Sequence, residues 1–352
     1  MRNLSFRQWL ILAVVLCLLP VASVYAEGNK TYKFELHGTD PVIAHHTWPA
    51  WDGTYTDPGA VVVHDGKFYM FRNGFKAWPA SVQIGYAVSD DGLTWTEPSA
   101  DPVLMSADVP FAGVAALASS AVVLEDGTWV LYFYTWTTKA STTSPGVIGR
   151  ATAAHPEGPW KVDAAPVLVP GNKGTWDSRQ VSAPRVVQTA TGFVMYYAGT
   201  SGDLRTTSRI GLATSTDGIT WVKYNDPATT DALYAESDPI MTPDTDHLPA
   251  LKMVHQPAVV QTPDGWVMIY RYVDTTIVGN QMVLSVATSV DGIHWTYDSR
   301  DRLWTSLQMP TKKSFWYTAL AYNTGTYYLY IEGENGSYTD IYVATFAGQI
   351  KP

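Results

Sequence analysis

The sequence predicts an all-β fold, a β-propeller of five blades, on three observations. Short runs rich in Val, Tyr and Thr alternate with Gly-containing turns, and no long stretch has helical periodicity. Related strand-and-turn motifs recur along the chain. The five copies of one short motif, seen first as "DPVI" at 40–43, start 61 to 73 residues apart. A repeat of this length with four strands per copy is typical of a propeller, with a β-sandwich as the alternative.

The first segment of the chain is expected to be removed before folding. Arg2 and Arg7 precede an apolar run that is too short to span a bilayer, and "VYA" at 24–26 fits a cleavage site. We therefore expect residues 1–26 to be a secretory signal peptide, with an uncleaved anchor as the alternative. Residues 27–352 are expected to form one propeller domain, secreted to the extracellular space or the periplasm.

Composition excludes several classes of function. The only Cys is Cys17, inside the expected signal, so the mature protein has no disulfide, thiolate metal site or Cys nucleophile. Without Arg2 and Arg7 the chain keeps 21 basic and 32 acidic residues, a net charge of about −11. This charge argues against nucleic acid and anionic membrane surfaces as partners. We expect a monomer with a neutral or weakly charged ligand.

Three motifs define the four strands of each blade. A strand, a Gly turn and a strand come first, as in "AVVVHDGKFYMF" (60–71). A third strand runs into a turn that ends in Trp, and a short fourth segment follows. The turn is seen in "SDDGLTW" (89–95), "STDGITW" (215–221), "SVDGIHW" (289–295) and the variant "HPEGPW" (155–160). The fourth segment is "DPVI" (40–43), "DPVL" (101–104), "APVL" (165–168), "DPIM" (238–241) or "DRLW" (301–304).

The last copy of the repeat lacks its fourth strand. Residues 31–43, "TYKFELHGTDPVI", contain a strand with the matching ending. We expect this N-terminal strand to pair with 341–346 and to close the ring in the last blade, which leaves no long open edge.

The repeat distinguishes two faces of the predicted ring. Tight Asp-Gly hairpins occupy one face, so their aspartates are expected to be turn residues. The Trp that ends each turn motif is expected to pack between blades. Longer, irregular loops occupy the other face, where a ligand site is expected.

Asp57 differs from its repeat counterparts. Alignment of the innermost strands on the turn Gly matches it with Ala118, Ala183, Gln256 and Trp316, so the turn does not require an Asp there. The position is predicted to lie at the start of an innermost strand, beside the central channel and on the loop-bearing face. A functional carboxylate is one interpretation; the alternative is an Asp that caps local backbone N–H groups.

The segments 56–71, 151–160 and 176–221 resemble a known superfamily. "TDPGAVVVHDGKFYMF", "ATAAHPEGPW" and "WDSRQVSAPRVVQTATGFVMYY" are similar to the five-bladed glycosidases, namely arabinanases and β-xylosidases of family 43, with invertases and levansucrases as relatives. The resemblance implies that Asp57 is a general base or nucleophile. The family's two other carboxylates fall on Ser120 and Ser182, so a partner for Asp57 must come from elsewhere.

Three acids are predicted to lie on the loop-bearing face. Asp177, in the connection "GTWDSRQVSAP", is the first choice as proton donor because that loop is expected to pass over the channel mouth. Glu332 is the second, and Asp274 is the third. Glu332 shares its repeat position with Arg72 and Arg271, so a structural ion-pair cluster is the alternative, and a nearby arginine would lower the pKa of Glu332.

Sugar binding requires aromatic and polar side chains around a concave site. Further candidates for binding substrate on this face are Trp48, Trp51, Arg72, Trp176, His255, Gln256, Arg271, Asp274 and Trp316. No carboxylate cluster of the kind that calcium prefers is present, so neither a cofactor nor a metal is predicted. A cation in the channel near His255 is the alternative, which the resemblance implies.

The function predicted on these grounds is a secreted glycoside hydrolase acting on a plant- or microbe-derived oligosaccharide or polysaccharide. A glycoside phosphorylase is one alternative, in which Arg72, Arg179, Arg185 and Arg271 would bind phosphate. A carbohydrate-binding propeller without catalysis is the other, which Ser120 and Ser182 favour.

Overall fold

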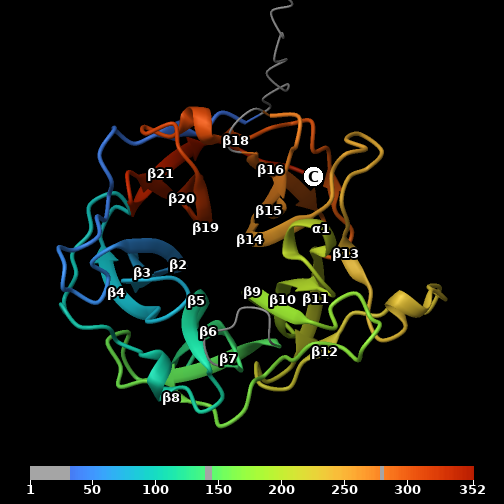
Figure 1. Ribbon diagram of the computed structural model, residues 1–352, viewed down its shortest axis with the longest axis horizontal. Helices are drawn as coiled ribbons and strands as arrows, with labels where there is room; N and C mark the ends of the chain where they lie inside the picture. The colour runs from blue at the N-terminus through green and yellow to red at the C-terminus, as the bar shows by residue number, and fades with distance from the viewer. Residues whose placement is uncertain (1–31, 139–144, 278–280) are drawn as a thin grey trace, which may run out of the picture.

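The computed structural model describes residues 32–138, 145–277 and 281–352 (Figure 1). The expected signal peptide therefore lies outside the described residues. Strands dominate the structure, which confirms the predicted all-β class. In the part of the chain that is described, no helix has the length and apolar character needed to cross a membrane.

The strands form five antiparallel units of consecutive strands. Unit one contains β2 (Tyr55–His64), β3 (Lys67–Phe75) and β4 (Gln83–Ser89). Unit two contains β5 (Val114–Val123), β6 (Trp129–Trp136), β7 (Gly146–Ala153) and β8 (Lys161–Val162). Unit three contains β9 (Gln180–Thr189), β10 (Gly192–Thr200), β11 (Arg209–Ser215), β12 (Val222–Lys223) and β13 (Pro239–Met241).

Units four and five complete the structure. Unit four contains β14 (Val254–Thr262), β15 (Gly265–Val273), β16 (Met282–Ser289), β17 (Thr296–Tyr297) and β18 (Trp304–Thr305). Unit five contains β19 (Phe315–Asn323), β20 (Thr326–Asn335), β21 (Tyr338–Ala347) and β1 (Glu35–Leu36). The helical turns are α1 (Leu204–Thr207), η1 (Ser106–Asp108), η2 (Ala232–Tyr234) and η3 (Ser306–Gln308).

The first strand of each unit lies nearest the centre of the molecule. Figure 1 shows β2, β5, β9, β14 and β19 around a common centre, with later strands farther out. Short parallel contacts link Tyr55 to Thr339 and Gly146 to Gln180, so the units combine into three open sheets.

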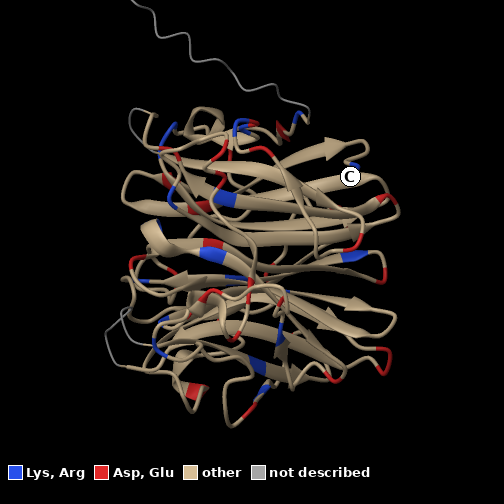
Figure 2. Ribbon diagram, turned by 90° about the vertical axis from the view of Figure 1, so that its right-hand side faces the viewer, with Lys and Arg blue, Asp and Glu red and all other residues tan. Residues whose placement is uncertain are grey.

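Asp-Gly turns lie at one end of the strands, as the sequence predicts. Asp91 accepts hydrogen bonds from the backbone N–H groups of Leu93 and Thr94, and Asp217 and Asp291 do the same in their units. Asp65 has φ of 48° and Gly66 has φ of 76°; two positive values in succession are typical of a tight hairpin with Gly at the second position. In side view, acidic residues mark the turns at the right-hand end of the strands (Figure 2). We call this end the hairpin face and the other end the loop face.

The Trp that ends each turn motif packs against the preceding unit. Ring centroids are 5.3–5.9 Å apart in the four pairs, which are Trp160–Phe71, Trp221–Tyr132, Trp295–Tyr196 and Trp95–Tyr330. The last pair joins unit one to unit five by the same contact that joins the other neighbours. The buried apolar side chains of the described residues likewise form five clusters, each mainly between two neighbouring units.

The N-terminal segment packs on the last unit. Glu35 and Leu36 of β1 pair with Thr345 and Ala344 of β21, and Ile43 bridges to Ile341. This is the pairing predicted for residues 31–43, of which residue 31 lies outside the described range.

We expect Phe34→Ala to lower the free energy of unfolding by about 3 kcal/mol, because the mutation leaves a cavity in a closely packed core. Phe34 is buried, and its ring lies 5.6 Å from that of Phe346. Chemical denaturation measures the change. Glu35→Ala, at the exposed position that follows Phe34, is the control. Equal effects of the two substitutions would contradict a packing role for this segment.

Candidate active site

A β-bulge near the start of each innermost strand positions the candidate residues. The register with the second strand shifts at Asp57/Ala60 in unit one and at His255/Ala258 in unit four. Units two, three and five have shifts at the corresponding places. A bulge bends its strand and redirects one side chain, and bulges are common beside active sites. The site therefore begins with backbone geometry that all five units share.

Asp57 is held at its bulge by a single side chain. Asn73 of β3 donates to Oδ1 of Asp57 at 2.7 Å, and the same amide bonds the backbone of Ala118 in unit two. Oδ2 of Asp57 is buried without a hydrogen-bond partner among the described residues. Burial raises the pKa of Asp57 well above its usual value, and the charge of Glu332 raises it further.

Glu332 of β20 is the second carboxyl of this pair. It is 3% exposed, and its Oε2 accepts a hydrogen bond from the backbone N–H of Tyr317 at 2.9 Å. Burial raises the pKa of Glu332 to about 7, although Arg271 acts in the opposite direction. The expectation that an arginine would make Glu332 a poor acid is therefore corrected, because burial outweighs the charge of Arg271.

Two tyrosines accompany the carboxyl pair. The hydroxyl of Tyr134 donates to that of Tyr317 at 3.2 Å, and both rings are close enough to Asp57 and Glu332 for their charges to interact. Burial raises the pKa of both phenols, so they stay protonated at neutral pH. The sequence prediction missed them, although Tyr134 occupies the repeat position of Glu332 and Arg271.

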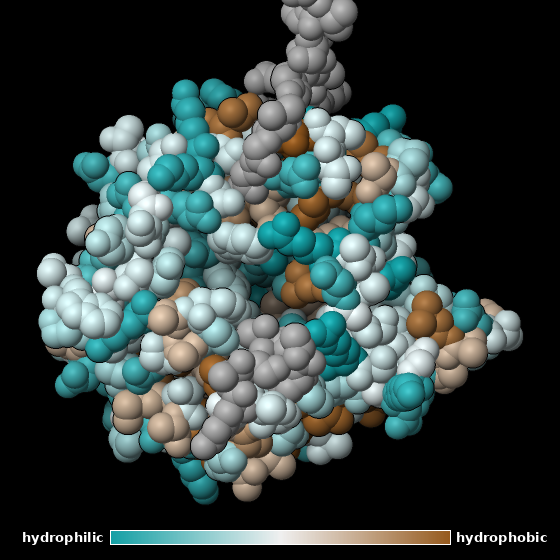
Figure 3. All heavy atoms as spheres, viewed as in Figure 1, coloured by the Kyte–Doolittle hydropathy of each residue, from teal (hydrophilic) through white to brown (hydrophobic). Residues whose placement is uncertain are grey.

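A pocket of about 640 Å³ opens beside these groups. Space-filling atoms show the loop face hollowed near its centre (Figure 3). Of the predicted residues, four line the pocket: His255, Arg271, Trp316 and Glu332. Lining residues that were not predicted as site residues include Tyr55, Trp78, Tyr134, Trp136, Arg179, Gln180, Ser182, Tyr317, Glu334 and Tyr338. Asp57 itself is fully buried next to the pocket.

His255 and Arg271 present unsatisfied donors in this region. Nη2 of Arg271 lies 3.2 Å from Nδ1 of His255, and its Nη1 donates to the carbonyl of Trp316. Burial lowers the pKa of His255 well below its usual value, so the ring is neutral. Because the guanidinium of Arg271 can only donate to Nδ1, the proton of the ring is assigned to Nε2. Nε2 of His255 and Nε of Arg271 are buried without partners among the described residues.

Trp316 and Gln256 differ from their predicted roles. The ring of Trp316 faces the guanidinium groups of Arg205 and Arg271, at 5.4 and 5.6 Å, so cations cover a ring that was expected to stack on sugar. Gln256 does not line the pocket; its backbone has φ of 53°, and its Oε1 is buried without a partner in the described structure.

Arg72 and Trp51 form a structural network instead of binding substrate. Nη1 of Arg72 donates to Asp52 at 2.7 Å, and the same guanidinium bonds Glu97. The ring of Trp51 packs 4.7 Å from Arg72, and its Nε1 donates to the carbonyl of Ala100. Neither side chain lines the pocket, which corrects both predictions. Trp48 is 64% exposed beside Lys76, also outside the pocket lining.

Trp176 and Asp177 repeat this Trp–Asp arrangement in unit three. Nε1 of Trp176 donates to the carbonyl of Ser237, which precedes an Asp-Pro pair as Ala100 does. Asp177 accepts from Nζ of Lys223 at 2.6 Å and is fully buried. The structure therefore does not bring Asp177 to the pocket, and its expected position over the channel mouth is corrected. The sequence could have predicted this structural role, because "WD" recurs at 51–52 and 176–177.

Two further predicted positions are also accounted for by local contacts. Asp274 is buried, bonds Thr276 and pairs with Arg302, so it does not reach the pocket. The hydroxyl of Ser120 bonds the backbone of Val186 in the next unit, whereas Ser182 lines the pocket.

We expect Asp177→Asn to lower the free energy of unfolding by about 1–3 kcal/mol, because Lys223 loses a charged partner. Catalytic constants should stay unchanged. Thermal denaturation and steady-state kinetics measure the two effects, with Asp52→Asn as the matched variant in unit one. A loss of activity without a loss of stability would restore Asp177 as a candidate proton donor.

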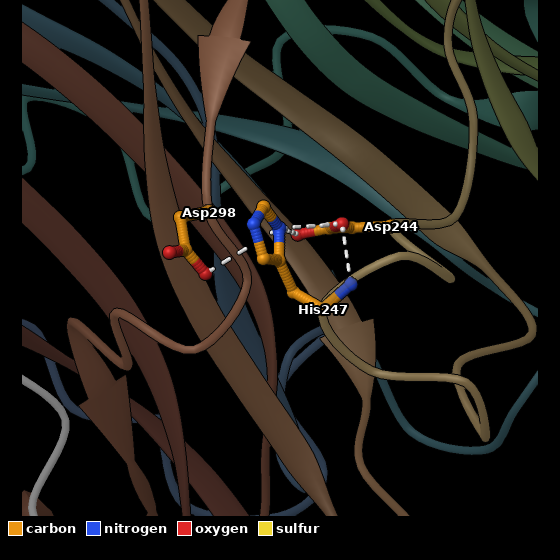
Figure 4. A group of neighbouring side chains, drawn as sticks. All are labelled: Asp244, His247 and Asp298. Atoms are coloured by element: carbon orange, nitrogen blue, oxygen red, sulfur yellow. Dashed lines mark hydrogen bonds and ion pairs between the residues drawn. The ribbon is translucent and has the colours of Figure 1, made fainter.

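Among the described residues, one group of potential metal ligands lies outside the pocket. Asp244, His247 and Asp298 have ligand atoms within 4.8 Å of one another (Figure 4). Nδ1 of His247 is 2.9 Å from Asp244 and 3.7 Å from Asp298, and Asp244 also accepts from the backbone of Ser299. These contacts join the 242–253 loop to the end of β17, and none of the three residues lines the pocket.

Comparison with known proteins places the chain in a family. The model described as the glycosyl hydrolases family 32 N-terminal domain matches residues 46–254, more than half of the chain. The chain belongs to this family. Family 32 belongs to the same propeller superfamily as family 43, which the sequence resembles, so the resemblance to this superfamily is confirmed. Among curated proteins, none matches the sequence.

Solved structures of glycosidases share the fold of this family 32 chain. A candidate glycosidase from Bacteroides thetaiotaomicron VPI-5482 has a TM-score of 0.66 at 16% identity, over 89% of this chain and 96% of that one. A family 117 glycoside hydrolase from Zobellia galactanivorans has a TM-score of 0.60 at 16% identity, over 91% of both chains. The GH43_1 enzyme from Xanthomonas citri, complexed with xylotriose, has a TM-score of 0.58 at 17% identity, over 87% of this chain and 89% of that one.

Proposed function

We propose that this protein is a glycoside hydrolase in which Asp57 and Glu332 are the catalytic carboxyl groups. The observation that carries the proposal is the placement of two buried carboxyls: Glu332 lines a pocket of about 640 Å³, and Asp57 has a carboxyl oxygen without a hydrogen-bond partner among the described residues. Burial raises the pKa of both groups. Pairs of acids whose environments hold a proton at neutral pH are typical of catalytic sites. The family 32 match and the glycosidase fold support hydrolysis of a glycosidic bond.

The two carboxyls have different roles in the proposal. Glu332 lines the pocket and has a pKa of about 7, so it is the proton donor to the leaving group. Asp57 is proposed as the general base or nucleophile, because its Oδ2 has no competing partner in the described structure. To act, it must first release the proton that burial and the charge of Glu332 favour. Asp57 is fully buried, whereas Tyr134 and Tyr317, whose phenols interact with its charge, line the pocket.

The substrate is proposed to be an oligosaccharide or polysaccharide of plant or microbial origin. Sugar hydroxyls would accept from Nε2 of His255 and Nε of Arg271, which lack partners within the described residues. Aromatic side chains line the pocket on several sides, among them Tyr55, Trp78, Trp136 and Tyr338. Such a lining suits the apolar faces of sugar rings.

We also propose that the five units form a closed five-bladed propeller and that the protein is exported as a monomer. Closure is supported by the unit one to unit five contacts, including Trp95 on Tyr330 and the backbone bond from Thr339 to Thr54. Export is supported by residues 1–26 alone. Carbohydrate is the proposed partner, without nucleic acid, membrane, cofactor or metal.

The phosphorylase alternative loses part of its basis. Arg72 is committed to Asp52 and Glu97, and Arg185 lies outside the pocket lining, so only Arg179 and Arg271 of the four arginines line the pocket. The non-catalytic alternative is favoured by Ser120 and Ser182 at positions where the resembled family has carboxylates.

One experiment separates these functions. The full chain is incubated with a panel of plant and microbial oligosaccharides, with and without phosphate, and products are identified by mass spectrometry. A free reducing sugar in both conditions is expected. A sugar phosphate formed only with phosphate would identify a phosphorylase, and binding without product would identify a non-catalytic protein.

A further inference from the structure

A second cavity lies at the opposite end of the innermost strands. It has a volume of about 390 Å³ and is lined by residues from β2, β5, β9, β14 and β19, a few positions before their hairpin turns. Most lining side chains are Val or Ala, and two Gln side chains, Gln188 and Gln261, also line it. No Asp or Glu is among the lining residues. The cavity therefore belongs to the hairpin face, away from the candidate active site.

Arg185 is the only charged residue in this lining. Its side chain is about nine-tenths buried, and it crosses from unit three to two other units. Nε donates to the carbonyl of Val259 at 3.0 Å, and Nη2 donates to the carbonyl of Leu320 at 2.9 Å. Nη1 has no partner among the described residues. Burial lowers the pKa of Arg185 to about 10, so the group remains a cation at neutral pH.

Two other buried arginines have the carboxylate partner that Arg185 lacks, whereas Arg271 in the candidate active site, within the described residues, has no such ion pair either. Arg72 pairs with Asp52 and Glu97, and Arg150 pairs with Asp163 at 3.0 Å. No carboxylate within the described structure pairs with Arg185. A buried charge without a counter-charge is costly, and carbonyl groups compensate for only part of that cost.

We propose that the cavity binds a small inorganic anion, chloride or phosphate, at Nη1 of Arg185. A guanidinium N–H forms strong charge-assisted hydrogen bonds to anions, and the amide groups of Gln188 and Gln261 supply further donors. The anion would neutralise a cation that bonds the carbonyls of Val259 in β14 and Leu320 in β19. The proposal does not depend on the hydrolase assignment, because the cavity and the active-site pocket have no lining residue in common.

The test is anion-dependent thermal stability of the full chain. Melting temperature is measured in sodium HEPES at constant ionic strength, with chloride or phosphate replacing part of the buffer anion. We expect a rise of about 2 °C or more in the wild type, because a ligand that binds only the folded state stabilises it. The arm that saturates at the lower concentration identifies the anion.

Two variants and a direct measurement decide the outcome. Arg185→Gln keeps a hydrogen-bonding side chain without charge and should lose the anion response, whereas Arg150→Gln should keep it. An equal response in Arg185→Gln, or none in the wild type, would overturn the proposal. If Arg185→Gln does not fold, wild-type crystals soaked in bromide or arsenate should give an anomalous peak beside Nη1 of Arg185, and its absence from both would overturn the proposal.

Discussion

Asp57→Asn is expected to reduce the hydrolysis rate by at least about 10³-fold at every pH, because an amide neither accepts a proton nor attacks carbon. No other described carboxyl occupies this point of the repeat. The last paired residue before the bulge is Ser182 in unit three, His255 in unit four and Phe315 in unit five, which corrects the sequence alignment of Asp57 with Ala183, Gln256 and Trp316. The measurement is kcat on the best substrate from the panel, across the pH range of the wild type.

Folding stability provides the control for this variant. The folded-state pKa of Asp57 is raised, so the folded protein binds a proton that the unfolded chain has already released. Stability is therefore lost as pH rises from the unfolded pKa towards the folded one. Asp57→Asn removes this penalty, and its melting temperature at neutral pH should equal or exceed that of the wild type. Full activity in the variant would refute the role of Asp57.

Glu332→Gln is expected to slow substrates with poor leaving groups by about 10²–10⁴-fold, while aryl glycosides with good leaving groups lose much less. A proton donor must be protonated, so wild-type kcat should fall as pH rises through about 7, the pKa of Glu332. The variant should lack this limb of the pH profile. Steady-state kinetics on both substrate types measures the difference.

Glu334→Gln is the matched control for Glu332. It lies two residues farther along β20, lines the same pocket and bonds Nε1 of Trp316. We expect it to change KM more than kcat and to keep the high-pH limb. An equal loss on both substrate types in Glu332→Gln would show that Glu332 is not the proton donor.

The all-β class and the turns were predictable because they rest on local chemistry. A Ser-x-Asp-Gly turn specifies its own hydrogen bonds, so Asp91, Asp217 and Asp291 act as the sequence indicates. The Trp after each turn was also predictable as an inter-unit contact, because its spacing is constant. The pairing of β1 with β21 followed from a missing strand in the last repeat.

The site was predictable only where it breaks the repeat. Asp57 and Glu332 differ from their counterparts, both are buried, and burial raises the pKa of both. The position of Asp177 over the channel mouth was predicted from the length of its loop alone. The packing of Trp176, which holds this loop against unit three, could not be inferred from the sequence pattern. The pKa of Glu332 depends on burial by side chains distant in sequence, and a sequence pattern does not measure burial.

The bulges described above have an evolutionary consequence. Each unit of the fold offers the same bent backbone at the entrance of its innermost strand, and only unit one fills that position with an acid. His255 stands at this place in unit four, so a single nucleotide change in its codon, to Asp, would place a carboxylate in an equivalent setting of another unit. In such an architecture, an acid at the equivalent position of another unit needs no new backbone. Relatives can therefore share the fold and have their catalytic acids at different positions of the sequence.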